Sequence, residues 1–493
     1  MQKTPIETIP FTPCKMNESS LKKKTAIAIA WNSFEKIGSQ LVFFAIGIYV
    51  ARLLTPGDYG LIGMLGIFSA ISLVLVDSGF SSALVRKTDA DESDYNTVFY
   101  FNLGVSSLIY LLLYIFAPAI SDFFNEPRLT LLSRVLFSGI IINSLGIIQS
   151  TLLTKKLQFR KTSIVNVGSL LLSGILAVIL VRKGFGVWTL VWQMLSASAF
   201  KVTLLWFFGN WHPRFLFSLQ SLKEQMKYSA EMTIAGILGT TSQYVYSLII
   251  GKNFTSESLG NFTQASKMSD MPITTLSGTI YSAMFPTYSQ IKDDAERLKR
   301  AFQKTIRFTA FVAFPILFGL ILIGPNLFEI LLTKKWEGSF LYFQLLCLAG
   351  IPTIFTTVIQ NFIRINQRVT LFVYFEIAKI GFLAIAILSA IKFGITALVV
   401  SLVAVRFLVY LMNLYYIGKK VNYHWHEQLR DMLPYFTIGL GMVIVSYPLC
   451  YIIENSSLLI IAQTAAGAIF YIGISKYLKS KVLDDLIAMV FKK

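Results

Sequence analysis

The amino-acid sequence predicts an all-α membrane protein of about 14 transmembrane helices, arranged as two six-helix bundles with two further C-terminal helices. Three observations support this prediction. Hydrophobic residues make up 55% of the 493 residues and charged residues only 14%, against roughly 25% charged residues in a typical soluble protein. Apolar segments long enough to span a bilayer as helices recur from residue 25 to residue 478. A short motif near residue 55 returns 200 positions later, which indicates an internal repeat.

Apolar runs, bounded by charged residues or by Pro and Gly, predict the transmembrane helices one by one. The predicted spans are residues 25–52, 59–84, 97–119, 130–153, 163–182, 186–209, 228–251, 259–286, 306–323, 340–363, 370–391, 396–417, 433–453 and 458–478. Most Lys and Arg residues fall in the loops and helix ends on the side of the N-terminus. Because positive charge marks cytoplasmic loops, both termini are expected in the cytoplasm.

The predicted spans group into lobes. Residues 1–24 form a cytoplasmic segment, 25–209 an N-lobe, 228–417 a C-lobe, 433–478 the last two helices and 479–493 a cytoplasmic tail. The first fifteen residues look unstructured, and Met16 is as plausible a translation start as Met1. A secretory signal is not expected, because the apolar region from Thr25 is too long and lacks a cleavage pattern.

The composition excludes a soluble enzyme, a disordered protein and a single-anchor receptor. The net charge of +18 is attributed to the basic cytoplasmic loops, so no nucleic-acid partner is expected. The three cysteines, Cys14, Cys347 and Cys450, are far apart and predict no disulfide framework or metal site. His424 and His426 are read as a solvated loop pair in preference to metal ligands. No cofactor is expected.

The internal repeat is visible at two places. Arg52, Thr55 and Gly60 stand where the first span gives way to the second, and Lys252, Thr255 and Gly260 stand between the seventh and the eighth. Gly184-Phe185-Gly186 before the sixth span is echoed by Lys392-Phe393-Gly394 before the twelfth. Six spans followed by six similar spans predict two parallel bundles, with the substrate site of a transporter between them.

Ten charged residues fall inside predicted spans. They are the cations Lys36, Lys201, Lys267, Lys379 and Arg406 and the acids Glu35, Asp77, Glu231, Asp270 and Glu376. A charge at the centre of a membrane helix costs about 2.5–3.5 kcal/mol, so most of these side chains must face a water-filled cavity or pair with each other.

The spacing of these charges leaves alternatives open. Lys267 and Asp270 are three residues apart, as are Glu376 and Lys379, so each couple either forms a structural ion pair or lines a functional cavity. Lys36, Lys201 and Arg406 have no opposite charge at pairing distance along a helix and are expected to line a cavity. Pro272 lies two residues after Asp270, and a helix bent or broken there would mark a transport site. Glu231 is expected at the membrane surface.

No enzyme motif is present. The sequence lacks a phosphate-binding loop and a His-Glu-x-x-His motif, and the predicted outside loops are short. The chain is therefore not expected to be an enzyme.

A run of short segments resembles a known family. They are residues 51–61 (ARLLTPGDYGL), 77–80, 83–85, 94–99, 117–127, 149–157, 259–267, 272–286 and 297–301. Across residues 20–420 the sequence resembles polysaccharide flippases of the multidrug/oligosaccharidyl-lipid/polysaccharide exporter superfamily. It is most similar to the branch that holds colanic acid exporters and teichuronic acid export proteins.

The resemblance implies a V-shaped carrier of 14 helices in two lobes. Its substrate would be an oligosaccharide repeat unit on undecaprenyl pyrophosphate. The carrier would move it from the inner to the outer leaflet of the bacterial cytoplasmic (inner) membrane, by alternating access coupled to an ion gradient. The family's cationic cavity corresponds here to Lys36, Lys267, Lys379 and Arg406, joined by Lys201 from the charge pattern. Asp270, Asp77, Glu35 and Glu376 are then candidates for ion coupling or ion pairing. Membrane lipids and the polysaccharide polymerase and export machinery would be further partners.

Three alternatives stay open from the sequence. The same fold would serve to export the peptidoglycan lipid precursor or small drugs, and a carboxylate-centred cavity at Asp77 or Asp270 would suit a drug. A membrane-embedded glycan polymerase is a second alternative, although the short outside loops argue against it. A scaffold for glycan-assembly enzymes is a third, but it would not need charges in the middle of the membrane.

Overall fold

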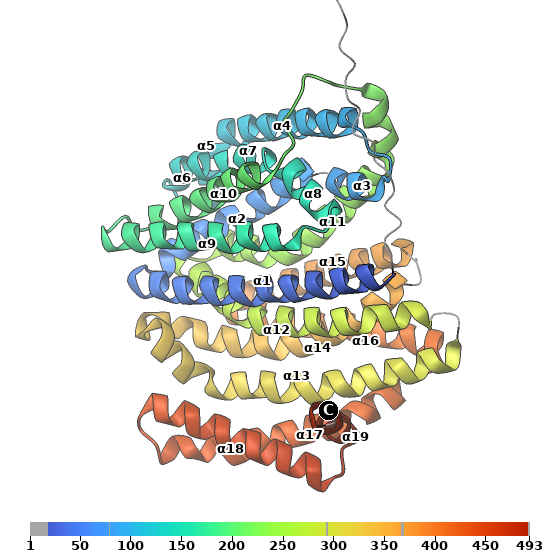
Figure 1. The fold of residues 1–493 in the computed structure, drawn as a ribbon. Helices are drawn as coiled ribbons and strands as arrows, with labels where there is room; N and C mark the ends of the chain where they lie inside the picture. The colour runs from blue at the N-terminus through green and yellow to red at the C-terminus, as the bar shows by residue number, and fades with distance from the viewer. Residues whose placement is uncertain (1–17, 78, 292–293, 366–368, 492–493) are drawn as a thin grey trace, which may run out of the picture.

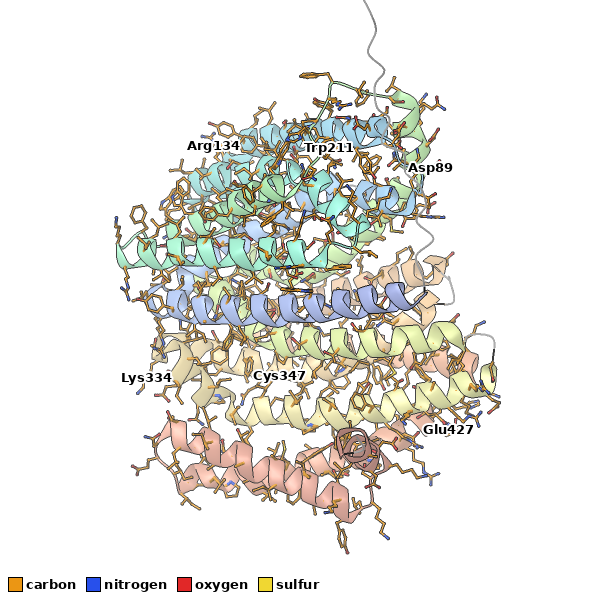
Figure 2. The ribbon with its side chains drawn as sticks, viewed as in Figure 1. Asp89, Arg134, Trp211, Lys334, Cys347 and Glu427 are labelled. Atoms are coloured by element: carbon orange, nitrogen blue, oxygen red, sulfur yellow. The ribbon has the colours of Figure 1, made fainter. Side chains whose placement is uncertain are left out.

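The computed structural model describes residues 18–77, 79–291, 294–365 and 369–491, and this part of the chain is helical with no strand. The helices lie side by side in a stack, and the axes of most of them are nearly parallel (Figure 1). The helices therefore end on two opposite sides of the molecule. Figure 2 labels Arg134 and Lys334 on one of these sides and Asp89 and Glu427 on the other. We call the side with Arg134 and Lys334 the Arg52 end, because α1 ends there just after Arg52. We call the opposite side the Asp89 end.

In the part of the N-terminal half that the structure describes, there are ten helices. They are α1 (Glu18–Leu53), α2 (Pro56–Asp77), α3 (Phe80–Arg86), α4 (Glu92–Ile115), α5 (Ala117–Phe124), α6 (Leu129–Leu136), α7 (Ser138–Ser144), α8 (Ile147–Lys155), α9 (Phe159–Arg182) and α10 (Trp188–Phe208). Several are pieces of one crossing. For example, Leu129–Ser144 and Ile147–Lys155 meet at 41°.

The C-terminal half continues the stack. It holds α11 (Leu219–Asn253), α12 (Ser256–Gln290), α13 (Ala295–Leu332), η1 (Lys334–Ser339), α14 (Phe340–Ile365), α15 (Val369–Ala390), η2 (Ile391–Phe393) and α16 (Ile395–Val421). The chain ends with α17 (Trp425–Ser446), η3 (Tyr447–Tyr451), α18 (Ser456–Tyr477) and α19 (Lys481–Phe491). Helices α17 and α18 pack on α13 at the outer edge of the stack (Figure 1).

The all-helical membrane fold is confirmed. Each of the 14 predicted spans falls on a helix or on a broken pair of helices. Within the described residues, ten helices are long and apolar enough to cross a membrane, or eleven if the bent pair counts as one span. Helices α11 and α12 are long enough but are not among the ten, because Ser, Thr and charged residues are spread along them. The protein is therefore a multi-pass membrane protein.

The repeated motifs produce the same local structure twice. The Thr55 hydroxyl accepts the backbone N–H of Asp58 at the start of α2, and the Thr255 hydroxyl accepts the N–H of Ser258 at the start of α12. Such side-chain caps satisfy N–H groups that a helix start leaves free, each contributing about 1 kcal/mol. Gly186 before α10 and Gly394 before α16 both have positive φ, of 53° and 91°, which glycine adopts without strain. The superposition of residues 25–209 on 228–417 stays a prediction.

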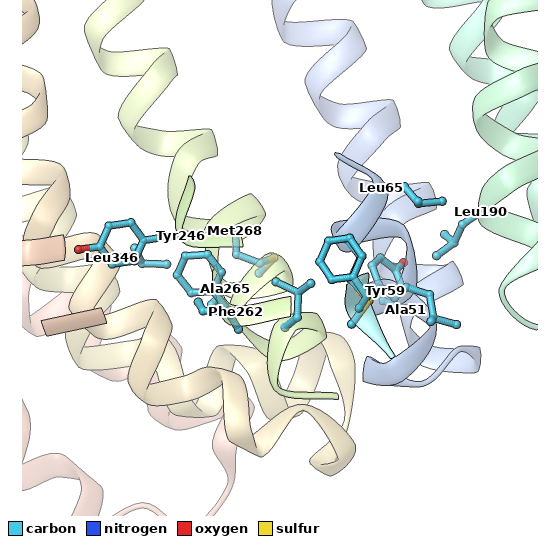
Figure 3. Packing of buried hydrophobic residues seen from close by; sticks show 14 of the residues in the cluster. Ala51, Tyr59, Leu65, Leu190, Tyr246, Phe262, Ala265, Met268 and Leu346 are labelled. Carbon is cyan, nitrogen blue, oxygen red and sulfur yellow. The ribbon is translucent and has the colours of Figure 1, made fainter. Parts of the chain in front are cut away.

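Two large hydrophobic clusters hold the stack together. The first contains residues of both halves, among them Ala51, Tyr59, Phe262 and Leu346, and lies towards the Arg52 end (Figure 3). The second lies within the C-terminal half and joins α12–α14 to α17 and α18. Full burial of one large apolar side chain contributes about 1.5–3 kcal/mol, so a cluster shared by both halves binds them firmly at that end.

Three expectations need correction. Residues 481–491 of the expected tail form α19, which buries Val482 and Leu483 and joins Lys304 to Asp485 by a 2.7 Å ion pair. Helix α1 begins at Glu18 and so enters the segment 1–24, while the first fifteen residues lie outside the described part. Helix α12 continues through Pro272 without interruption.

Candidate functional site

The two halves meet at the Arg52 end through the repeated motif itself. A Cβ atom added to Gly60 would lie 1.7 Å from the carbonyl oxygen of Ser256, and one added to Gly260 would lie 1.7 Å from that of Pro56. Position 56 corresponds to 256 in the repeat, and position 60 to 260, so each motif places its glycine against the helix start of the other. Only glycine allows backbones to approach this closely.

Side chains from α1 and η1 reinforce this contact. The Arg52 guanidinium donates to the carbonyl oxygens of Leu331, at 2.8 Å, and Ile330, and the Lys335 ammonium donates to the carbonyl of Arg52. The buried Trp336 indole donates to the carbonyl of Ala51 at 3.0 Å and meets the edge of the Tyr59 ring. These contacts close the Arg52 end. The Arg52 side chain of α1 satisfies carbonyls at the end of α13, and the Lys335 and Trp336 side chains of η1 satisfy carbonyls at the end of α1.

At the Asp89 end, α11 packs on the N-terminal half. The buried Asp94 carboxylate accepts hydrogen bonds from Lys87 at 3.0 Å, from Gln225 at 3.3 Å and from the Ser221 hydroxyl. The hydrogen bond to Asp94 raises the pKa of Lys87. Helix α11 therefore joins the two halves. It packs on α2, α3 and α4 of the N-terminal half and on α12 and α15 of the C-terminal half, and its Tyr246 hydroxyl lies 2.9 Å from the Ser401 hydroxyl on α16.

The central cations have separate environments. The exposed Lys267 ammonium on α12 lies 4.9 Å from the centre of the Tyr59 ring, a cation–π contact, and is not ion-paired with Asp270. Asp270 accepts a 3.2 Å hydrogen bond from Ser266 and lies close enough to Arg406 on α16 for their charges to attract. Arg406 itself donates to the Thr353 hydroxyl at 3.3 Å. An ion pair between Lys267 and Asp270, one of the two alternatives, is therefore absent.

The second couple does form an ion pair. The Lys379 ammonium lies 2.6 Å from the Glu376 carboxylate, whose side chain is only 8% exposed. The positive charge of Lys379 is thus largely neutralised by its own helix.

The two neighbouring charged side chains of α1, Glu35 and Lys36, have different surroundings. Glu35 accepts hydrogen bonds from Asn166 at 2.6 Å and Ser163 at 3.3 Å, and so fixes α1 to α9. Lys36 is exposed and forms no hydrogen bond or ion pair with any residue that the structure describes. Glu231 is exposed, which agrees with a position at the membrane surface.

A cavity of about 570 Å³, lined by both charged and apolar side chains, lies within the N-terminal half, between α2–α3 on one side and α8 and α10 on the other. Asp77 and Lys201 line it, together with Arg86 and Asn143. Sequence reasoning selected Asp77 and Lys201 singly but did not place them together. Two breaks in helices, at Gly79 and between α7 and α8, bring these residues together, and no proline marks either break in the sequence.

The described residues contain no cluster of three or more His, Cys, Asp or Glu side chains suited to a metal ion. The rings of His424 and His426 stack 5.6 Å apart at the exposed start of α17, with only Glu427 close by. The charged side chains and their neighbours thus offer cations, hydroxyls and amides for binding.

Comparison with known proteins assigns the family. Residues 49–341 match the model of a family described as polysaccharide biosynthesis protein. The chain belongs to this family. It is 24% identical to the succinoglycan biosynthesis transport protein ExoT of Rhizobium meliloti, over 90% of this chain and 91% of that protein. It is 22% identical to the teichuronic acid biosynthesis protein TuaB of Bacillus subtilis, over 92% of this chain and 95% of the relative.

Solved structures confirm the fold of this polysaccharide biosynthesis family member. It is similar to the lipid II flippase MurJ in an inward closed conformation, with a TM-score of 0.70 and 14% identity, covering 92% of this chain and 99% of that one. It is also similar to a multidrug resistance MATE family transporter of the MOP superfamily in an inward-facing conformation, with a TM-score of 0.62 and 17% identity. That match covers 80% of this chain and 98% of the transporter. The fold is that of MOP superfamily transporters.

Proposed function

We propose that this protein is a flippase that moves a lipid-linked oligosaccharide across the bacterial cytoplasmic membrane by alternating access. The observation that carries the proposal is the closed Arg52 end, where the repeated motif of each half holds the other through Gly60 and Gly260. A reciprocal contact between two related halves can open by rocking the halves apart while the rest of each bundle stays rigid. Membership of the polysaccharide biosynthesis family supports a glycan as the cargo.

The cations fit a lipid pyrophosphate as the carrier of the glycan. Lys267, Arg406 and Lys36 are the candidates to bind it, because none of them is neutralised by a direct ion pair within the described residues. Guanidinium and ammonium groups are the side chains that bind phosphate oxygens most strongly. Lys379 is a weaker candidate, since Glu376 already balances its charge. Undecaprenyl pyrophosphate is the expected lipid.

We place the Asp89 end in the cytoplasm and the Arg52 end outside. The Lys and Arg residues gathered in the loops and helix ends of the Asp89 end support this orientation, since cytoplasmic loops are enriched in them. Asp270 and Asp77 are the candidates to couple transport to an ion gradient, because each carboxylate has only a hydroxyl as its direct partner within the described residues. A C-terminal reporter that is active only outside the cell would contradict this orientation.

Deleting the gene tests the proposed function. The deletion strain should accumulate lipid-linked repeat units on the inner leaflet and lose surface polysaccharide, and a plasmid copy should restore export. Sidedness is measured by labelling the glycan in intact and in permeabilised spheroplasts. Accumulation of units that are labelled in intact spheroplasts would instead indicate a polymerase acting after transport. Likeness to the lipid II flippase concerns the fold alone and does not favour the peptidoglycan precursor as cargo.

A further inference from the structure

Three charged side chains, Asp77, Arg86 and Lys201, line the cavity in the N-terminal half, and none of them forms an ion pair with a residue that the structure describes. Lys201, in the middle of α10, forms no hydrogen bond or ion pair with any residue that the structure describes. An unpaired ammonium inside the membrane costs about 2.5–3.5 kcal/mol unless it faces water or a ligand. Arg86 lines the cavity nearer the Asp89 end, where its guanidinium lies 5.2 Å from the centre of the Tyr228 ring.

Two broken helices line the same cavity. Helix α2 gives way to α3 at Gly79, whose φ is +70°, and both Asp77 before the break and Ser81 after it face the cavity. On the opposite side, α7 and α8 meet at a 41° bend, and Asn143 and Gly146 line the cavity there. Irregular backbone at membrane depth is tolerated where it lines a polar cavity, and broken helices mark substrate sites in transporters.

The lining chemistry suits a sugar that carries one negative charge. Lys201 and Arg86 supply two positive charges and Asp77 one negative charge, which leaves one net positive charge for a ligand to balance. Hydroxyl and amide groups, which complement sugar hydroxyls, line the wall beside apolar side chains such as Leu73, Val76 and Val202. The hydroxyl and amide groups are those of Ser81, Ser82, Asn143, Ser150, Thr151 and Thr154.

The volume of the cavity agrees with such a ligand. About 570 Å³ falls within the roughly 300–1,000 Å³ typical of sites for small organic molecules, and it leaves room for a short saccharide. A pyrophosphate is a poorer fit, because its higher negative charge would lie close to the Asp77 carboxylate.

We propose that this cavity binds an acidic saccharide unit of the transported glycan, with its carboxylate on Lys201 and Arg86 and its hydroxyls on Asp77 and the surrounding Ser, Thr and Asn groups. This proposal rests on the proposed function, because it assigns two parts of the lipid-linked oligosaccharide to two separate binding sites. The lipid pyrophosphate would be held by Lys267 and Arg406 between the halves, and the charged sugar by the N-terminal half. The protein would then select acidic glycans over neutral ones.

Binding of soluble saccharides to the purified full-length protein in lipid nanodiscs tests the proposal. Digalacturonate is the acidic probe, and digalactose is its neutral counterpart. We expect digalacturonate to bind more tightly than digalactose. Lys201→Met, which keeps the length of the side chain and removes its charge, should weaken digalacturonate binding by roughly ten- to hundredfold, as loss of a charge-assisted hydrogen bond does. Lys201→Arg should retain most of the affinity.

Two further variants make the result decisive. Arg86→Gln changes an exposed residue that is expected to fold normally, and it should also weaken digalacturonate binding if Lys201→Met protein proves unstable. Lys183→Met, at the exposed end of α9 outside the cavity, is the matched control and should bind as the unmodified protein does. Equal affinity for the two disaccharides, or unchanged digalacturonate binding in both cavity variants, would overturn the proposal.

Inorganic pyrophosphate separates the two proposed sites. It should not displace digalacturonate, and displacement would show that the cavity is the pyrophosphate site and that this proposal is wrong. A gene-deletion strain that still exports polysaccharide would contradict the proposed function while leaving the measured saccharide binding intact. Conversely, normal export by a strain carrying Lys201→Met, combined with unchanged binding, would remove only the proposal for this cavity.

Discussion

At the scale of single residues, three cations on the central helices have three different environments. Lys267 lies over the Tyr59 ring, Arg406 donates to Thr353 and lies near Asp270, and Lys379 is ion-paired with Glu376. A cation–π contact contributes about 0.5–2 kcal/mol and leaves the positive charge available to a ligand. An ion pair with a buried carboxylate neutralises the positive charge instead. Removing Lys267 and removing Lys379 should therefore have different consequences.

Lys267→Ala is expected to lower export while the protein stays abundant. The ammonium is exposed and holds no carboxylate, so its loss removes a ligand contact and leaves no buried charge behind. Loss of such a contact reduces affinity by roughly ten- to hundredfold. Export is measured as surface polysaccharide per unit of membrane protein. Tyr59→Phe keeps the ring and is the matched control. A fall in abundance equal to the fall in export would contradict a binding role.

Lys379→Ala is expected to lower the amount of folded protein instead. Removing one partner of a buried ion pair leaves the other charge uncompensated, which typically costs about 3–5 kcal/mol. Glu376→Gln in the same chain removes that charge and should restore abundance. Thermal unfolding of the purified variants measures the effect. If Lys379→Ala alone leaves the unfolding temperature unchanged but abolishes export, then Lys379 binds substrate.

Sequence spacing identified these charged residues but not their partners. Lys267 and Asp270 share the spacing of Glu376 and Lys379, yet only the second couple forms an ion pair. Spacing of three residues puts two side chains on one face of a helix, and neighbouring helices then decide which contacts form. Tyr59 on α2 lies beside Lys267, while Arg406 on α16 lies near Asp270, and neither is close in the sequence.

At the scale of helices, the close approach of α2 and α12 depends on glycine at two matched positions. Gly60 and Gly260 each leave no room for a Cβ atom against the backbone of the other helix start. By contrast, the Cβ of an alanine at Gly57 would have its nearest neighbours at 3.8 Å, an ordinary contact distance. The two glycines are therefore expected to be needed only when the Arg52 end is closed.

Gly60→Ala should hold the two halves apart at the Arg52 end, and Gly57→Ala should not. Spin labels on exposed residues of α5 and α13 report the distance between the halves by pulsed electron paramagnetic resonance. We expect the Gly60→Ala distribution to shift to longer distances and export to fall at least tenfold. Gly260→Ala should act in the same way. An unchanged distance in both variants would show that the halves close without this contact.

The helices themselves could be predicted from apolar length, but their interruptions could not. Pro272 suggested a break in α12 that does not occur, because a proline can continue a helix whose freed carbonyl is satisfied by neighbouring groups. The breaks lie instead at Gly79 and near Gly146, where the sequence carries no proline. The cavity that they line was missed for this reason, since its residues come from five helices, α2, α3, α7, α8 and α10, that are spread over residues 73–205 of the sequence.

At the scale of the whole molecule, the two halves are joined unequally at their two ends. The Arg52 end is closed by the repeated motif and by Arg52, Lys335 and Trp336. At the Asp89 end the N-terminal half is held to α11 by Asp94, while the ammonium of Lys36 on α1 stays exposed. Alternating access requires the first of these contacts to break and re-form in every transport cycle.

A reversible crosslink between α2 and α12 can hold the Arg52 end closed. A Cβ atom at Gly63 would lie 2.9 Å from the Thr263 hydroxyl oxygen, and the two positions correspond in the repeat. Cysteines at both positions should therefore form a disulfide, which needs a Cβ–Cβ separation of about 3.8 Å. Cys14, Cys347 and Cys450 are first replaced, so that no other thiol reacts.

Transport by this crosslinked protein tests the account most directly. The Gly63→Cys/Thr263→Cys protein is reconstituted into liposomes, and the passage of lipid-linked oligosaccharide to the opposite leaflet is followed by its accessibility to an enzyme that modifies the glycan. We predict transport in the reduced protein, none after oxidation, and full recovery when the disulfide is reduced again. Transport that continues at the same rate in the oxidised protein would contradict alternating access through the Arg52 end.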